Sequence, residues 1–296
     1  MLAALLSLSG ALLWGAADFL GGLTARHLKP IVVTAIAACT GVVVLLIAAP
    51  IAGGTLSAAD AAWGAISGVC GVVSLALLYA CLAIGPMSIL SPLTAIVSAV
   101  APMIWGVTVG GESLGPLAWA GLGVALVAVA LVGFVPEQGA VRPSIRGLAL
   151  AVGAGLAIGA QIIAIDHTSA ESGLDALLVS RAVNVTLTVL IVAGMIAWAA
   201  ARRRSVVEAL RSPAAVAGSR IVWWPAAVGG VGDAVANIAM LLALRTGDLS
   251  IVAALTALYP AGTIVLAAIV LRERIAPVQI VGLTLALGAA VMLALD

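Results

Sequence analysis

The chain has 296 residues, of which 64% are hydrophobic and 8% are charged, and its formal net charge is +1. Soluble domains average about 45–50% apolar and about 25% charged residues, so this composition excludes an ordinary water-soluble protein. The mean hydropathy of +1.29 is that of a chain that lies in lipid. We expect the lipid bilayer, and no nucleic acid, as its partner.

Apolar runs of about twenty residues recur along the whole chain. At about 1.5 Å per residue, each can cross about 30 Å of hydrocarbon as a helix. We therefore predict an all-α integral membrane protein with ten transmembrane helices. The first run has no basic leader and is longer than the apolar part of a signal peptide, so we expect it to be retained. The ten predicted spans are residues 2–23, 31–51, 61–82, 87–109, 116–134, 147–165, 174–200, 221–244, 249–271 and 277–295.

Basic residues gather on one side of this arrangement. Of the thirteen Lys and Arg residues, eleven lie in the loops that follow odd-numbered spans. The positive-inside rule places these loops in the cytoplasm and both termini outside. Arg181 differs because it lies within the seventh span, and we expect it to pair with Asp175 or with a neighbouring carbonyl.

Metal and cofactor motifs are missing from the sequence. Cys39, Cys70 and Cys81 are single residues inside spans, with no CxxC pattern and no Cys/His cluster. His27 and His167 are isolated near predicted helix ends. No metal site, disulfide or cofactor is therefore predicted.

A long internal repeat divides the chain. The stretch GPMSILSPLTAIVS at 85–98 returns in altered form as GDLSIVAALTALYP at 247–260, which is a displacement of 162 residues. A later match at a displacement of 161 aligns Glu112 with Glu273, and ALLWGAA at 11–17 aligns weakly with GLAIGAQ at 155–161. These matches pair spans 1, 3, 4 and 5 with spans 6, 8, 9 and 10.

The number of spans in each half fixes how the halves are related. Five spans is an odd number, so the second half must enter the membrane upside down relative to the first. We predict two inverted repeats, residues 1–134 and 147–296, joined by a loop at 135–146. Two such halves can expose one midplane site to each side in turn, as secondary transporters require.

Three stretches resemble a known family. They are WGAADFLGGLTARHL at 14–28, GPMSILSPLTAIVSAVAP followed by GES, and GDLSIVAALTALYP followed by RERIAPVQIVG. Together they look like the EamA branch of the drug/metabolite transporter superfamily. The resemblance implies a basket-shaped carrier with a central cavity lined by helices 1, 3, 4, 6, 8 and 9, and export of amino acids, amphipathic metabolites or drugs. Relatives often have both termini in the cytoplasm, the reverse of the orientation given by the charges.

Polar residues inside the spans are the candidate substrate contacts. A charged side chain at the bilayer centre costs about 2.5–3.5 kcal/mol, so it normally faces protein or water. Trp14 and Asp18 share a face of the first span, and Asp233 and Asn237 share one face of the eighth. The two acids are also the candidates for proton coupling, and we favour Asp233 because it lies deeper in its span. The alternative for Asp18 is that its side chain simply reaches the membrane–water interface.

Further candidates in the predicted cavity are hydroxyl and amide side chains. Small hydroxyl residues at helical spacing also join helices through hydrogen bonds of about 0.6 kcal/mol, so a packing role is the alternative for them. Tyr79 could instead anchor the interface, and Gln161 could stabilise a kink. These candidates are Tyr79, Ser91, Thr94, Ser98, Gln161, Thr256 and Tyr259.

These patterns favour a secondary transporter over an enzyme. No Walker A pattern, GxSxG motif or paired acidic motif appears in the sequence. We expect export of amino acids or other small amphipathic metabolites by alternating access, with proton coupling as an added hypothesis. An intramembrane enzyme and a scaffold without transport are the alternatives. The expected location is the bacterial inner membrane, as a monomer or weak homodimer.

Overall fold

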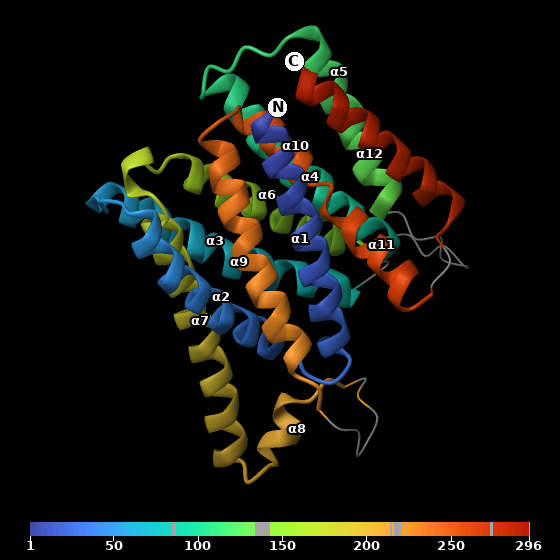
Figure 1. Cartoon of the computed structure of the whole chain (residues 1–296). Helices are drawn as coiled ribbons and strands as arrows, with labels where there is room; N and C mark the ends of the chain where they lie inside the picture. The colour runs from blue at the N-terminus through green and yellow to red at the C-terminus, as the bar shows by residue number, and fades with distance from the viewer. Residues whose placement is uncertain (85–86, 134–142, 214, 216–220, 273–274, 296) are drawn as a thin grey trace.

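The computed structural model describes residues 1–84, 87–133, 143–213, 215, 221–272 and 275–295, except the side chains of residues 79, 82–84, 87–88 and 91. The described chain is a bundle of long helices, and the two termini lie at the same end (Figure 1). The elements are α1 Leu2–Ala25, α2 Pro30–Ala52, α3 Ala58–Ile84, α4 Met87–Thr108, α5 Pro116–Gly133, α6 Ile145–Asp166, η1 Ala170–Ser172, α7 Asp175–Ala201, α8 Val206–Leu210, α9 Trp224–Leu244, α10 Leu249–Thr256, α11 Tyr259–Val270 and α12 Pro277–Leu295.

The all-α membrane architecture predicted from the sequence is confirmed. Within the described residues, nine helical segments are long and apolar enough to cross a membrane, and α4 adds an apolar helix at Pro92–Thr108. The ninth span is divided into α10 and α11 at residues 257–258. Pro260 stands at the start of α11 and has no N–H to donate back, which accounts for the break. The short α8 lies in the loop between the seventh and eighth spans.

The helix contacts follow the internal repeat. The pair α1 and α9 corresponds to the pair α6 and α3, and α2 with α9 corresponds to α7 with α3. The helices α5 and α12 pack on each other across the repeat. Close approach depends on glycine at matching places. A Cβ built on Gly15 would lie 2.7 Å from Thr263 N, and one built on Gly159 would lie 3.0 Å from Ala101 Cβ, so α1–α11 and α6–α4 are equivalent contacts.

Polar contacts join the two repeats at the end of the bundle that carries the termini. The Asp60 carboxylate accepts hydrogen bonds from Ser169 N at 2.6 Å and Ser169 Oγ at 3.0 Å. Arg245 donates to Thr168 Oγ1 at 2.7 Å and to Ser169 O at 2.7 Å. We call Asp60, Thr168, Ser169 and Arg245 the termini-side network. It joins the first turn of α3 to the segment between α6 and η1 and to the C-terminal end of α9.

A second contact at this end stabilises the start of α10. Glu112, in the loop before α5, accepts a hydrogen bond from Leu249 N at 2.6 Å and one from Ser250 N at 3.2 Å, and the Ser250 hydroxyl also donates to it. A carboxylate at a helix N-terminus satisfies free N–H groups and lies at the positive end of the helix dipole. A loop of the first repeat thereby caps a helix of the second.

Candidate functional site

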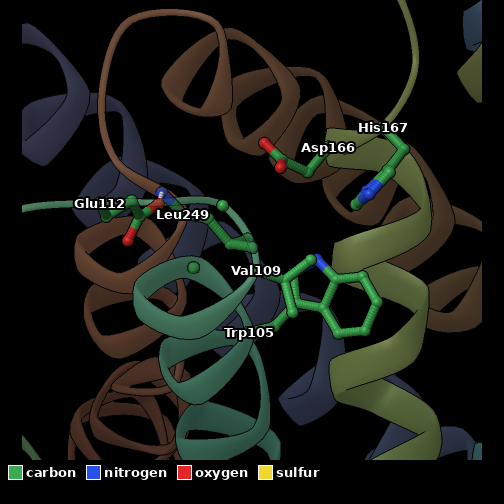
Figure 2. A pocket seen from close by; sticks show the side chains of 8 residues that line it. Trp105, Val109, Glu112, Asp166, His167 and Leu249 are labelled. Carbon is green, nitrogen blue, oxygen red and sulfur yellow. Dashed lines mark hydrogen bonds between the residues drawn. The ribbon is translucent and has the colours of Figure 1, made fainter.

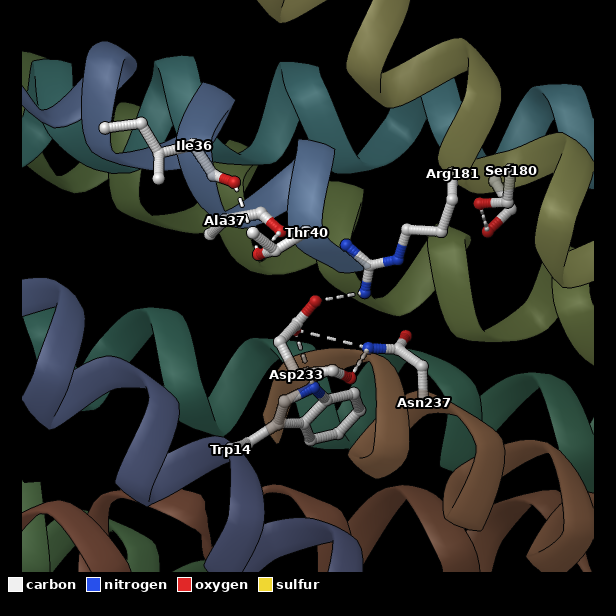
Figure 3. A network of polar contacts seen from close by, with 9 residues as sticks. Trp14, Ile36, Ala37, Thr40, Ser180, Arg181, Asp233 and Asn237 are labelled. Carbon is white, nitrogen blue, oxygen red and sulfur yellow. Dashed lines mark hydrogen bonds and ion pairs between the residues drawn. The ribbon is translucent and has the colours of Figure 1, made fainter. Parts of the chain in front are cut away.

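An ion pair inside the membrane spans is the centre of the candidate site. Asp233 Oδ2 on α9 lies 2.5 Å from Arg181 NH2 on α7, and the two side chains are only 27% and 13% exposed. Trp14 on α1 donates from Nε1 to Asp233 Oδ1 at 3.0 Å. Asn237, one turn further along α9, donates to the same oxygen at 3.2 Å and to the Asp233 carbonyl at 2.7 Å. Figure 3 shows these four side chains converging from three helices.

The position of Arg181 differs from the sequence prediction. We expected Asp175, six residues earlier, or a carbonyl as its partner, whereas the guanidinium reaches across the bundle to Asp233. The structure therefore adds α7 to the helices that supply the site. The signal was present in the sequence: a cation and an anion, each within a span, both need a partner because hydrocarbon cannot solvate them.

Two amide side chains lie beside the position of the first repeat that is equivalent to Asp233. Gly71 on α3 occupies the position equivalent to Asp233. A Cβ built on Gly71 would lie 3.0 Å from Gln161 Oε1 on α6 and 3.3 Å from Asn184 Nδ2 on α7. Asn184 Oδ1 is buried and accepts no hydrogen bond within the described residues. Gln161 and Asn184 therefore offer polar atoms beside a place where the chain has no side chain.

Asp18 lies near this cluster without joining its hydrogen bonds. Its carboxylate is within electrostatic range of Asp233 and of Tyr259, at the start of α11. Its side chain is exposed, and in the described part of the chain no hydrogen bond to it is found. Asp18 is thus an acid that lies close to the ion pair and has no cation of its own among the described residues.

The buried hydroxyl candidates bond to backbone carbonyls. Thr94 donates to Leu90 O at 3.0 Å and to Ala151 O on α6 at 3.1 Å, which links α4 to α6. Ser98 bonds to Ala95 O at 2.8 Å, and Thr256 bonds to Val252 O at 2.8 Å. These contacts are those expected of helix packing. The side chains of Tyr79 and Ser91 lie outside the described residues.

A separate pocket of about 250 Å³ opens at the end of the bundle that carries the termini (Figure 2). Its lining includes Trp105, Glu112, Asp166 and His167. The His167 ring contacts two indoles, with centroid distances of 4.8 Å to Trp63 and 5.7 Å to Trp105. Aromatic and acidic side chains thus meet beside the termini-side network.

The described helices define a multi-pass membrane protein built from two repeats. A model of the EamA-like transporter family matches residues 1–134 and 145–295, so the chain belongs to that family. None of the curated proteins matches the chain. One solved structure, titled "Crystal structure of protein", has a TM-score of 0.73 and 17% sequence identity and covers 99% of this chain and 96% of its own. That likeness concerns the fold alone.

Proposed function

We propose that this chain is a secondary transporter for small zwitterionic metabolites of the amino-acid type, working by alternating access. The observation that carries the proposal is the ion pair between Arg181 and Asp233 inside the spans, with Trp14 and Asn237 bonded to the same carboxylate. Ionisable residues within spans mark substrate or ion pathways because lipid tolerates them only where they have a function or a partner.

The pair of opposite charges suits a substrate that carries both charges itself. A zwitterion can place its carboxylate on the Arg181 guanidinium and its ammonium group on the Asp233 carboxylate. The ion pair then opens without leaving either charge unpaired, which is the costly outcome in a low-dielectric site. The Trp14 indole beside Asp233 gives an apolar surface for an amphipathic substrate, and the amides of Gln161 and Asn184 offer further hydrogen bonds.

Alternating access requires contacts between the repeats that can break and re-form. In the termini-side network, the N–H and hydroxyl of Ser169 in the second repeat donate to the Asp60 carboxylate in the first, and water can replace these bonds when that end opens. We propose that this network closes one end of the transport path. We also propose export from the cytoplasm across the bacterial inner membrane, as the family resemblance implies, by a monomer or a weak homodimer.

Proton coupling, where the carrier uses it, is assigned by us to Asp18. The sequence alone favoured Asp233, but that carboxylate already has a cation and two N–H donors. Asp18 has neither within the described residues, so it can gain and lose a proton without breaking the ion pair.

Counterflow in proteoliposomes tests the proposal. Vesicles loaded with a mixture of unlabelled amino acids should accumulate labelled substrate when they contain the wild type. Asp233→Asn removes a charge-assisted contact of about 1.5–3 kcal/mol and should lower the rate by about tenfold or more. Asp248→Asn is the matched control, because Asp248 is exposed and its side chain caps no helix N–H. Equal counterflow in the two variants would refute the assignment.

A further inference from the structure

A groove lies far from the ion pair, where the C-terminal part of α7 meets α8 and the start of α2. Its volume is about 640 Å³, and Ile191, Gly194, Met195 and Trp198 of α7 form its apolar floor. The helix stands clear of the bundle: 11% of its most apolar window is buried, compared with 56% for α9. In Figure 1 this part of α7 projects beyond the other spans with α8 beside it.

Backbone contacts fix the wall opposite α7. Lys29 N donates to Leu210 O at 2.9 Å, and Ser212 N donates to His27 O at 3.0 Å. These bonds tie the loop between α1 and α2 to the end of α8. The groove is therefore held between elements that are bonded to each other, and it is not a gap beside a free loop.

The rim of the groove carries charge of one predominant sign. Lys29 and Arg204 line it together with one acid, Glu208. Arg202 and Arg204 also lie over the Trp198 ring, at 5.6 Å and 5.3 Å from its centroid. A tryptophan with arginines at the end of an apolar helix is the arrangement found where a span leaves the hydrocarbon for the headgroup layer.

We propose that this groove binds one anionic phospholipid, with a single net negative charge on its headgroup. The phosphodiester lies between Lys29 and Arg204, Trp198 lies at the level of the glycerol, and an acyl chain runs along Ile191, Gly194 and Met195. The excess of cations over acid at the rim complements such a headgroup, and basic pockets between spans recognise anionic lipids in this way. The bound lipid supports the part of α7 that the bundle leaves uncovered.

Native mass spectrometry of the full chain tests the site. Protein from bilayers of equal amounts of phosphatidylglycerol and phosphatidylethanolamine, with matched acyl chains, is extracted in mild detergent and its retained lipid is counted. We expect Lys29→Gln/Arg204→Gln to lower phosphatidylglycerol retention by about tenfold or more. Arg26→Gln/Arg146→Gln is the control, since it removes two exposed cations at the same end of the bundle but outside the groove. Equal losses in the two double variants would overturn the proposal.

Two single variants separate a groove from surface charge. Gly194→Phe keeps every charge, and a Cβ built on Gly194 meets no atom within 4 Å, so this variant should fold and fill the groove. It should lose the lipid, and wild-type retention in Gly194→Phe would overturn the proposal. Glu208→Gln should keep or raise phosphatidylglycerol retention. If the wild type prefers phosphatidylethanolamine and Glu208→Gln loses that lipid, the groove binds a zwitterionic lipid. That result would overturn the anionic assignment.

Discussion

Helices α3 and α9 occupy equivalent places in the two repeats, and they are alike where they pack. A Cβ built on Gly68 of α3 would overlap the carbonyl of Ser180 on α7, and one built on Gly230 of α9 would overlap the carbonyl of Ala37 on α2. The two glycines are 162 residues apart, the displacement of the repeat. Helix packing is therefore duplicated between the two halves.

The same two helices differ where they face the candidate site. Position 71 of α3 is glycine and position 233 of α9 is aspartate, and positions 75 and 237 are leucine and asparagine. The ion pair with Arg181 therefore exists on one side of the pseudo-symmetry only. The comparison shows that the packing of these two helices is duplicated between the repeats, whereas the candidate site is chemically one-sided.

Breaking the ion pair between α9 and α7 should have the largest effect on stability. Asp233→Leu leaves the partly buried Arg181 guanidinium without its partner, and we expect it to destabilise the fold by about 3 kcal/mol or more. Arg181→Met/Asp233→Leu removes both charges and should melt close to the wild type. Thermal melting in detergent measures both, and if the double variant is as unstable as the single one, the pair is not the cause.

Making α3 resemble α9 should have the next largest effect. Gly71→Asp adds a carboxylate beside Gln161 and Asn184. Because Arg181 is already paired with Asp233, it does not serve as a partner for the new charge, and we expect the fold to be destabilised by about 2.5–3.5 kcal/mol. Gly71→Asn adds a side chain of the same shape without the charge and should cost less. Melting temperatures that do not separate the two variants would argue against a charge effect at this position.

Perturbing the shared packing should affect both helices equally. Gly68→Ala and Gly230→Ala each force a methyl group against a backbone carbonyl, for which we expect a loss of about 1–3 kcal/mol. Gly288→Ala on α12 is the control, because a Cβ there meets no atom within 4 Å. A large difference between the first two variants would contradict equivalent packing in the two repeats.

The smallest effect on stability is expected at Asp18. Because Asp18 has no cation partner within the described residues, Asp18→Asn should melt like the wild type. It should keep substrate exchange but lose accumulation driven by a pH gradient, since the amide cannot release a proton. Gradient-driven accumulation that survives in this variant would separate Asp18 from coupling.

The sequence predicts the spans well because hydrocarbon imposes a single requirement of length and apolar character on every helix. The break in the ninth span is likewise local, since it follows from Pro260. The partner of Arg181 is not local. It depends on how α7 of the second repeat approaches α9, and no spacing along one helix encodes that approach. Thr94 shows the same limit: its spacing on α4 could not decide between a ligand and the carbonyl of Ala151 that it contacts.

One binding measurement tests the central claim that Arg181 and Asp233 hold the two ends of a zwitterion. Isothermal titration of the wild type with each standard amino acid selects the tightest ligand, which is then compared with its amide and its N-acetyl derivative. The wild type should bind the free amino acid at least about tenfold more tightly than either derivative. Arg181→Gln should lose the discrimination against the amide alone, and Asp233→Asn the discrimination against the N-acetyl form alone. A wild type that binds no amino acid, or variants that keep both preferences, would contradict the account.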